Sequence, residues 1–547
     1  MFASYNDLTI GNFFDTQLKK YPDKVIQIFE NGVRQTYAQL NDRGNRLANG
    51  LLRLGLKKGD FVALYAMNCL EYMEFSLATA RIGVVGVLLN CFLPKERIAS
   101  MMEISGAKAI IYEDQYQEIV EFCKARVPMP KHYIMINRGK GEPGENVIDY
   151  NKLIHNAPDH KPGVKVAASD PYILLFTTGT TGEPKGVLKS MGGLFFHVLS
   201  NNFYGAYHTA AQKIGSPPYC NLRHLVVPPL FHIGPLAYPM YCFMMLRSMV
   251  VMRKFDPEKF LWLIDREKVN GVWIQPAMLY RIKQLSEECL AKYDCRSILA
   301  VICGGGPIKM AEVDDMMKFF PNATFSSNYG STETGSAALV TGDELNRTNE
   351  KNLGLPSLGA DLKIEDEEGN ELPKGKEGRI WITCPGLPIN CEYYKNPAKT
   401  KESFKDGWVF LGDLGYQDDE GYTYYTGREI EFIKSGGEKI SPLPIQSVLL
   451  SIKEVLAAEV VGVPDEKWGE AVQAVVIKEA GSQISEEEII QYCKGRLAKY
   501  EVPKSVDFVD SYPIGPTGKV LRKELKARYA NRETVSGEIA KKDSGER

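Results

Sequence analysis

Two kinds of segment alternate in the first half of the chain: segments in which apolar residues recur at helical spacing, and short apolar runs typical of strands. Apolar residues recur at helical spacing through residues 36–54 and predict an amphipathic helix, which Gly55 ends. Short apolar runs predict strands at 61–67, 84–90 and 107–113. Helices are predicted between them, at 70–82 and 94–105. Strand-like runs in the same rhythm recur at 222–228, 249–252, 271–275 and 298–303. This βαβ rhythm predicts an α/β fold with mostly parallel sheets covered by helices.

The pattern changes twice in the second half. Residues 350–427 are rich in Gly, Pro and Tyr, and their short strands and turns predict a β-rich subdomain. From residue 428 to 530 the pattern is compact α/β again, and 531–547 is a polar segment that predicts a flexible tail. We therefore predict a large N-terminal domain, 1–427, which includes the β-rich subdomain, and a small C-terminal α/β domain, 428–530.

Composition restricts the class of protein. The chain has 547 residues and a net charge of −2, which argues against a general nucleic-acid binder. Its eleven cysteines form no CxxC pair, so we expect free thiols in a reducing compartment. The N-terminus lacks the basic and apolar regions of a signal peptide, and no apolar run is long enough to span a membrane. We expect a soluble, cytoplasmic protein; peripheral membrane contact and a homodimer are left open.

The densest chemical signal follows the apolar run 172–176, which predicts a strand. The segment that follows is rich in hydroxyl groups and glycines and contains a lysine, a combination suited to bind a polyphosphate. Its residues are Thr177, Thr178, Gly179, Thr180, Thr181, Gly182 and Lys185. The segment is not a Walker A loop, because Pro184 precedes the lysine and Gly186 follows it. A flexible surface loop is the alternative for this segment taken alone.

This segment resembles the phosphate-binding signature of the adenylate-forming superfamily, which includes acyl-CoA synthetases, peptide-synthetase adenylation domains and beetle luciferases. Asn328-Tyr329-Gly330-Ser331-Thr332-Glu333 resembles a second motif of that superfamily. The resemblance implies that Tyr329 stacks near adenine, Thr332 bonds the α-phosphate and Glu333 helps to hold Mg²⁺. A carboxylate oxygen is a ligand that this hard cation prefers.

Further motifs follow in family order. The resemblance implies that Gly304, Gly305 and Gly306 let adenine approach the backbone. It implies that Asp413 bonds the ribose hydroxyls, which a carboxylate can accept together, and that Arg428 contacts the nucleotide. Residues implied for the CoA tunnel are Gly436 and Gly437.

Lys519, in the segment Pro513–Val520, matches the position of the catalytic lysine of adenylation. An ammonium on a flexible stem can stabilise charge that develops between the carboxylate and the α-phosphate. The chain departs from the pattern at Leu411, at Ile430 in the hinge, and at Pro444 and Gln446 after it.

The acyl pocket is expected near His232 and Gly234. Peptide-synthetase domains usually carry an Asp where this chain has His232, so an α-amino group would lack its partner. The apolar segment 233–246 either packs in the core or lines an acyl channel. A neutral or hydrophobic carboxylic acid is therefore the favoured substrate.

Together the motifs imply an AMP-forming acyl-CoA synthetase of the fatty-acid–CoA ligase type, which uses ATP, Mg²⁺ and CoA. Such an enzyme forms an acyl-adenylate, and a mobile C-terminal domain then presents the CoA site. The main alternative is a stand-alone ligase that loads a carrier-protein thiol. An inactive nucleotide-binding scaffold and a luciferase-like oxygenase are further alternatives.

Overall fold

The structure is a computed structural model of the 547-residue chain. The residues that it describes are 4–128, 130–139, 141, 143–177, 184–199, 221–304, 310–429, 432–435, 438–465, 468–513 and 520–530. The chain divides into two compact units. Unit 1 holds residues 1–362 and 381–409, and unit 2 holds 363–380 and 410–547.

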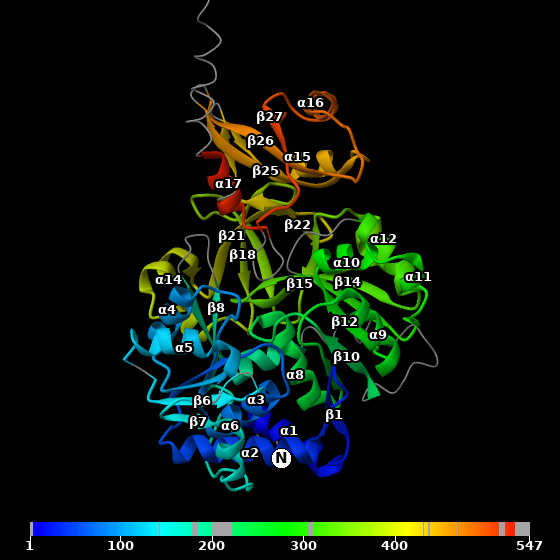
Figure 1. Ribbon diagram of the computed structural model, residues 1–547. Helices are drawn as coiled ribbons and strands as arrows, with labels where there is room; N and C mark the ends of the chain where they lie inside the picture. Colours follow the sequence, from blue (N-terminus) through cyan, green and yellow to red (C-terminus); the bar gives the residue numbers. More distant parts are fainter. Residues whose placement is uncertain are drawn as a thin grey trace, which may run out of the picture. The chain divides into compact units, whose positions relative to one another are not determined.

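Two sheets form the centre of unit 1 (Figure 1). The first follows the order β16 (Asn352–Pro356), β15 (Gly335–Thr341), β14 (Thr324–Ser331), β13 (Ala300–Gly304), β12 (Gly271–Ile274), β10 (Arg223–Val226), β11 (Ser248–Val251), β1 (Val25–Phe29) and β2 (Arg34–Thr36). Neighbouring strands from β14 to β1 are parallel, whereas β14–β15–β16 and β1–β2 are antiparallel. The expected strands at 222–228, 249–252, 271–275 and 298–303 are confirmed.

The second sheet of unit 1 follows the order β19 (Tyr393–Tyr394), β9 (Lys185–Ser190), β8 (Pro171–Thr177), β4 (Val85–Leu88), β3 (Phe61–Tyr65), β5 (Ala109–Glu113), β6 (His132–Ile136) and β7 (Val147–Asp149). Strands β8 to β7 are parallel to their neighbours, and β9 and β19 add an antiparallel edge. Strand β9 is the antiparallel partner of β8, so the two described ends of the expected phosphate segment, Thr177 and Lys185, face each other across these strands.

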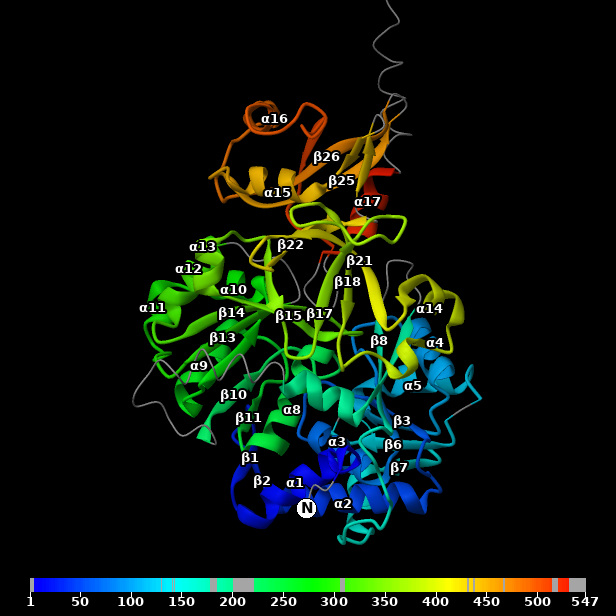
Figure 2. The same cartoon turned by 180° about the vertical axis from the view of Figure 1, so that it is seen from behind.

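Helices connect and cover these strands. Those of unit 1 are α1 (Ile10–Lys20), α2 (Tyr37–Arg53), α3 (Glu71–Ile82), α4 (Lys95–Ser105), α5 (Gln117–Lys124), α6 (Tyr150–His155), α8 (Ile233–Met245), α9 (Pro257–Glu267), α10 (Pro276–Lys283), α11 (Glu287–Leu290), α12 (Met310–Phe319), α13 (Gly342–Arg347) and α14 (Pro397–Ser403). Figure 1 shows α9, α11 and α12 grouped beside the strands β10, β12 and β14, and Figure 2 shows the same helices beside β10, β13 and β14. Every residue of α3 is buried, so this helix lies inside the hydrophobic core.

Helix α2 is the amphipathic helix expected at 36–54. Its Leu40, Leu47 and Leu51 are fully buried. The Thr36 hydroxyl accepts a hydrogen bond from the Gln39 N–H, which caps the first turn. Gly55 follows the helix with φ +86°, a left-handed conformation that glycine adopts without strain.

The apolar segment 233–246 forms α8, although it contains Pro235 and Pro239. Pro235 lies in the first turn, where a backbone donor has no helical partner, and Pro239 removes one internal hydrogen bond. Most of α8 is buried, so tertiary packing outweighs this cost. Among the described residues, no helix is both long enough and apolar enough to cross a bilayer.

The described residues of unit 2 form a β-sheet with three helices. Its elements are β23 (Ile433–Ser435), β24 (Glu438–Ile440), α15 (Pro442–Leu450), β25 (Val455–Asp465), β26 (Gly469–Lys478), α16 (Glu486–Lys494), β27 (Ser505–Phe508) and α17 (Arg522–Ala530). Strand β22 (Thr423–Arg428) also belongs to unit 2, while β17 (Asp361–Glu365), β18 (Gly378–Thr383) and β21 (Trp408–Gln417) span the boundary between the units. The boundaries predicted from the sequence, at 427 and 530, remain a prediction about which parts move together.

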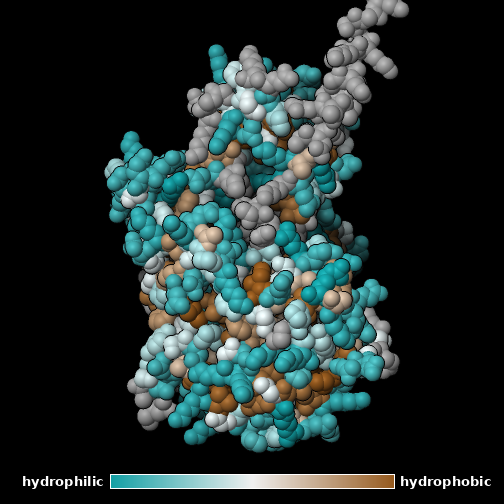
Figure 3. Space-filling view, turned by 90° about the vertical axis from the view of Figure 1, so that its left-hand side faces the viewer, coloured by the Kyte–Doolittle hydropathy of each residue, from teal (hydrophilic) through white to brown (hydrophobic). Residues whose placement is uncertain are grey.

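The surface carries both apolar and hydrophilic residues. Figure 3 shows one face, on which apolar residues form small groups among hydrophilic ones. Large apolar side chains that are at least 40% exposed include Tyr5, Phe92 and Trp468. Isolated exposed apolar residues are common on globular proteins and indicate no particular partner.

Candidate active site

The hairpin of β8 and β9 presents the two ends of the predicted phosphate segment. Thr177 ends β8, Lys185 begins β9, and the two residues are paired across the strands. Thr178–Gly182 lie outside the described residues. A Cβ atom on Gly186 would lie 3.1 Å from the Leu174 side chain and 3.3 Å from that of Tyr394. Glycine at this position therefore lets β19 pack closely against the hairpin.

The Lys185 ammonium lies 5.1 Å from the centre of the Tyr393 ring, a cation–π distance. Burial and the positive charge of Lys399 lower the pKa of Lys185, and Glu333 and Glu402 oppose that shift. Lys399 lies on α14 and was not predicted as a site residue. The positive charges of Lys185 and Lys399 are close enough to repel one another, so a polyanion that binds between them would relieve this repulsion.

The turn between β14 and β15 carries Thr332 and Glu333, and its own side chains hold it. The Ser331 hydroxyl accepts hydrogen bonds from the backbone N–H groups of Glu333 and Thr334, each at 3.1 Å. The Thr334 hydroxyl accepts one from the Ser331 N–H at 3.0 Å. These bonds fix the backbone of the motif, so the side chains of Thr332 and Glu333 start from one defined backbone conformation.

The Glu333 carboxylate is only 5% exposed and is held by Tyr393. The Tyr393 phenol donates a hydrogen bond to Glu333 Oε1 over 2.7 Å. Burial and the neighbouring carboxylate raise the pKa of Tyr393, so the phenol keeps its proton and remains a donor. Sequence reasoning missed Tyr393, because it lies 60 residues from its partner in the chain.

Two further buried groups lie behind this turn. The Lys189 ammonium donates hydrogen bonds to the backbone carbonyl groups of Glu333, at 2.9 Å, and Gly386. His197 accepts a hydrogen bond at Nδ1 from the Ser336 N–H over 2.9 Å. The ring of His197 is therefore the tautomer that carries its proton on Nε2, since the accepting nitrogen is unprotonated. Neither residue was predicted from the sequence.

The predicted adenine residues come together at the ends of β13 and β14. Gly304 is the register partner of Asn328, and the Asn328 amide donates to the Ser336 hydroxyl over 2.8 Å. Tyr329 and Gly330 follow on β14. A Cβ on Gly330 would lie 1.7 Å from the Gly335 carbonyl oxygen, so any side chain there would force the hairpin apart. Gly305 and Gly306 lie outside the described residues.

The predicted acyl-pocket residues lie at the start of α8. His232 is the residue that precedes this helix, and its ring centre is 4.6 Å from that of Phe231. Cβ atoms on Gly234 and Gly304 would lie 3.5 Å and 3.1 Å from the Trp273 indole. Trp273, on β12, therefore packs between a predicted acyl residue and a predicted adenine residue, and it too was missed from the sequence.

Unit 2 brings together the predicted ribose residue and Arg428. Asp413 on β21 and Arg428 on β22 are register partners, and the Arg428 Nε donates to Asp413 Oδ1 over 2.7 Å. Asp413 is 4% exposed, and this bond orients its carboxylate. Ile430, Gly436, Gly437 and Lys519 lie outside the described residues.

The structure explains one departure from the family pattern, that of Gln446 in the segment after the hinge. Gln446, on α15, is 7% exposed and donates to Glu459 Oε2 over 2.7 Å. The same oxygen accepts a hydrogen bond from Arg522 at 2.8 Å. A Glu at position 446 would set a second carboxylate against Glu459, so the amide suits this site better.

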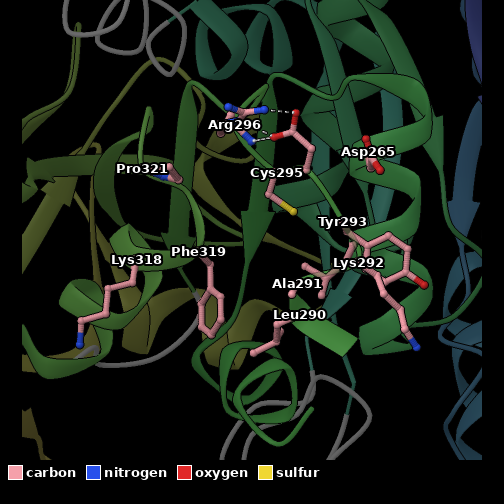
Figure 4. Close-up of a pocket in the computed structure, with 12 residues that line it drawn as sticks. Asp265, Leu290, Ala291, Lys292, Tyr293, Cys295, Arg296, Lys318, Phe319 and Pro321 are labelled. Atoms are coloured by element: carbon pink, nitrogen blue, oxygen red, sulfur yellow. Dashed lines mark hydrogen bonds and ion pairs between the residues drawn. The ribbon is translucent and has the colours of Figure 1, made fainter. Parts of the chain in front are cut away.

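A cavity of about 490 Å³ lies beside α9, α11 and α12 in unit 1 (Figure 4). Its lining includes Asp265, Lys292 and Lys318, and Arg296 forms an ion pair with Asp294 there. None of its lining residues is a predicted site residue, and its charges have both signs. We therefore do not include it in the candidate active site.

Comparison with known proteins identifies the family. The family model described as AMP-binding enzyme matches residues 14–388, and the AMP-binding enzyme C-terminal domain matches 444–519. The long-chain-fatty-acid–CoA ligase FadD13 of Mycobacterium tuberculosis is 31% identical over 91% of this chain and 94% of its own. The fatty acid–[acyl-carrier-protein] ligase ScoC of Streptomyces coeruleorubidus is 32% identical over 90% and 91%.

Comparison with solved structures leads to the same family. A fatty acyl CoA synthetase of Mycobacterium tuberculosis has a TM-score of 0.73 at 29% identity, covering 96% of this chain and 99% of that one. ATP-bound MatB from Rhodopseudomonas palustris has a TM-score of 0.82 at 26% identity, covering 95% and 99%. The chain therefore belongs to the AMP-binding enzyme family and is an adenylate-forming ligase, of the class whose CoA ligases use ATP, Mg²⁺ and CoA.

Proposed function

We propose that the protein is an AMP-forming acyl-CoA synthetase for a neutral, hydrophobic carboxylic acid. The observation that carries the proposal is the buried Glu333 carboxylate, held by Tyr393 in a unit whose Lys185 and Lys399 suit a polyanion. The Glu333 carboxylate offers hard oxygen atoms, which fit Mg²⁺, and the Thr332 hydroxyl would bond the α-phosphate. When bound, the ion would neutralise charge on the phosphates of ATP.

The proposed reaction has two steps. A carboxylate oxygen of the acid attacks the α-phosphorus of ATP, the bond to the bridging oxygen breaks, and pyrophosphate leaves. The sulfur of CoA then attacks the acyl carbon, the bond to the phosphate oxygen breaks, and AMP leaves while the thiol proton passes to solvent. In the first step Lys185 and Thr177 bind phosphate oxygens, Asp413 binds the ribose, and Lys519 stabilises the developing charge.

The substrate preference rests on the residues around α8. No Asp stands at position 232 to pair with an α-amino group, and Trp273 presents a large apolar surface between Gly234 and Gly304. We propose that the Trp273 indole is a wall of the acyl pocket. It limits how bulky an acid can be close to the carboxylate.

A ligase that loads a carrier-protein thiol is the second candidate. The observation that favours it is the 32% identity with ScoC, whose name gives an acyl carrier protein as acceptor. The two candidates share the adenylation step and differ only in the thiol that attacks the acyl-adenylate.

Pyrophosphate release across a panel of carboxylic acids tests the proposal. Acids from acetate to long-chain fatty acids, together with aromatic acids, are assayed with Mg·ATP alone, with CoA, and with a phosphopantetheinylated carrier protein. Sustained turnover that requires CoA supports the synthetase, and turnover that requires the carrier protein supports the second candidate. Release by the Glu333→Gln variant at the wild-type rate would contradict the site.

The same panel tests the pocket wall. The Trp273→Ala variant should accept bulkier acids than the wild type, because it removes the indole between the two glycines. Phe255→Leu serves as a control, since Phe255 packs against Phe260 in a hydrophobic cluster of unit 1 that does not include Trp273. An unchanged preference in Trp273→Ala would contradict the assignment of the wall.

A further inference from the structure

Lys189 is a buried cation that the proposed reaction does not yet use. It lies on β9 and is 1% exposed, which places it among the largest fully buried side chains of the described residues. No carboxylate of the described part of the chain forms an ion pair with it; the acceptors of its two hydrogen bonds are backbone carbonyl oxygens. A buried ammonium that forms no ion pair is costly, and an apolar side chain of similar size would avoid that cost.

The two carbonyl groups belong to separate segments. One is that of Glu333, in the turn between β14 and β15, and the other is that of Gly386, in the segment between β18 and β19. A third contact joins the same segments, because the Cys384 thiol donates to the Thr334 carbonyl oxygen over 3.2 Å. Lys189 therefore connects a strand of the second sheet to the turn that carries Thr332 and Glu333.

Glu333 therefore has one partner for its backbone and another for its side chain. Lys189 on β9 binds its backbone, and Tyr393 on the neighbouring strand β19 binds its carboxylate. Lys185 precedes Lys189 by four residues on the same strand, so the two side chains leave the same face of β9, roughly 13 Å apart along it. One strand thus serves both the phosphate segment and the turn with Glu333.

We propose that Lys189 is a positioning residue for adenylation, which fixes the backbone of Glu333 so that the Thr332 hydroxyl and the Glu333 carboxylate are aligned for Mg·ATP. The inference rests on the roles proposed above for Thr332 and Glu333. It assigns to Lys189 no contact with a substrate. A charged donor suits this task, because its hydrogen bonds to carbonyl groups are stronger than those of a neutral donor.

Burial lowers the pKa of Lys189 to about 8, and the nearby Cys384 and Glu333 partly oppose that shift. The protonated amine has three N–H donors, and it forms the two hydrogen bonds to the carbonyl groups of Glu333 and Gly386.

The test compares the two half-reactions in the Lys189→Met variant of the full chain. Met has a similar length and no donor, so the turn should lose its anchor without a large cavity. We expect the rate constant of acyl-adenylate formation, from single-turnover pyrophosphate release, to fall about 10–100-fold. The KM for the acid should stay near its wild-type value. Thioester formation from supplied acyl-adenylate and CoA should change less than about twofold, because that step uses neither Mg²⁺ nor pyrophosphate.

Restoring the charge provides the second measurement. Lys189→Arg keeps a cation with several N–H donors and should recover part of the lost adenylation rate. If the larger guanidinium prevents folding, Lys189→Gln takes its place, because its amide can still donate to a carbonyl group. The matched control is Tyr172→Phe on the paired strand β8, which loses a buried hydrogen bond to the Ser76 carbonyl but none to Glu333. This control should keep the wild-type rate.

Two results would overturn the inference. One is a folded Lys189→Met variant with a wild-type adenylation rate, and the other is an equal loss in both half-reactions. Wild-type protein and Glu333→Gln are run in parallel to separate this inference from the proposed function. If Glu333→Gln loses adenylation and Lys189→Met does not, only the role of Lys189 fails. If the wild type releases no pyrophosphate with any acid, the proposed function fails and this role fails with it.

Discussion

At the scale of single residues, the site depends on buried polar groups whose partners are distant in sequence. Lys189 and Glu333 are 144 residues apart, and Tyr393 and Glu333 are 60 apart. Motif reasoning proposed Glu333, Asp413 and Lys185 as site residues, because their chemistry is visible in short segments, and their roles remain predictions. It could not find Lys189 or Tyr393, because a lysine or tyrosine in a strand has no local signal of its partner.

His197 gives a prediction about stability and pH. Burial and the nearby Lys189 lower the pKa of His197 to about 3, whereas an unfolded histidine has a pKa of about 6.5. Between these values the unfolded chain binds a proton that folded His197 does not, so stability falls as pH falls. We expect this residue alone to lower the free energy of unfolding by about 2 kcal/mol between pH 7 and pH 5.

Urea unfolding at the two pH values measures this effect. His197→Gln should lose less stability than the wild type on going from pH 7 to pH 5, because Gln does not titrate. His160→Gln removes an exposed histidine and should keep the wild-type dependence. Identical pH dependence in the wild type and His197→Gln would contradict the prediction.

At the scale of elements, periodicity predicted much of the fold, and tertiary packing decided the exceptions. The alternation in residues 61–113 predicted β3, α3, β4, α4 and β5, because these elements follow the simple periods of buried strands and covering helices. Helix α8 was not predicted as a helix. Its apolar residues surround the whole helix and Pro239 lies inside it, so neither periodicity nor propensity favoured that structure over another.

Helix α15 shows how an unexpected residue can fit its element. Gln446 donates to Glu459, which Arg522 also binds. Gln446→Glu should lower the free energy of unfolding of unit 2 by about 1–3 kcal/mol, because it replaces this hydrogen bond with two facing carboxylates. Thermal and urea unfolding measure the change. Adding Glu459→Gln should restore part of the stability; a Gln446→Glu variant as stable as the wild type would refute this account.

At the scale of the whole molecule, the proposed reaction uses residues from both compact units. Thr332 and Glu333 belong to unit 1, Asp413 belongs to unit 2, and Lys519 lies outside the described residues. The sequence predicted a mobile C-terminal domain from its resemblance to a family, and that motion remains a proposal. If the domain moves between the half-reactions, residues of unit 2 should affect the two steps unequally.

Lys519 provides a direct test of whether a residue can affect the two half-reactions unequally. Lys519→Ala should reduce acyl-adenylate formation far more than the reaction of supplied acyl-adenylate with CoA, because its charge serves only the first step. The two rates are measured separately by pyrophosphate release and thioester formation. Lys526→Ala, which removes an exposed ion pair with Glu470 in unit 2, is the control. Equal losses in both steps would contradict the role of Lys519.

The close contact at the base of the β14–β15 hairpin also restricts how this protein can evolve. A Cβ on Gly330 would collide with the Gly335 backbone, and one on Gly335, where φ is +70°, would collide with the His197 ring. Neither glycine offers an atom that reacts. Substitution of either glycine would nevertheless disturb the hairpin, because an added side chain would collide with its neighbours. We therefore expect both glycines to be retained for steric reasons alone, even in descendants that acquire a different acid as substrate.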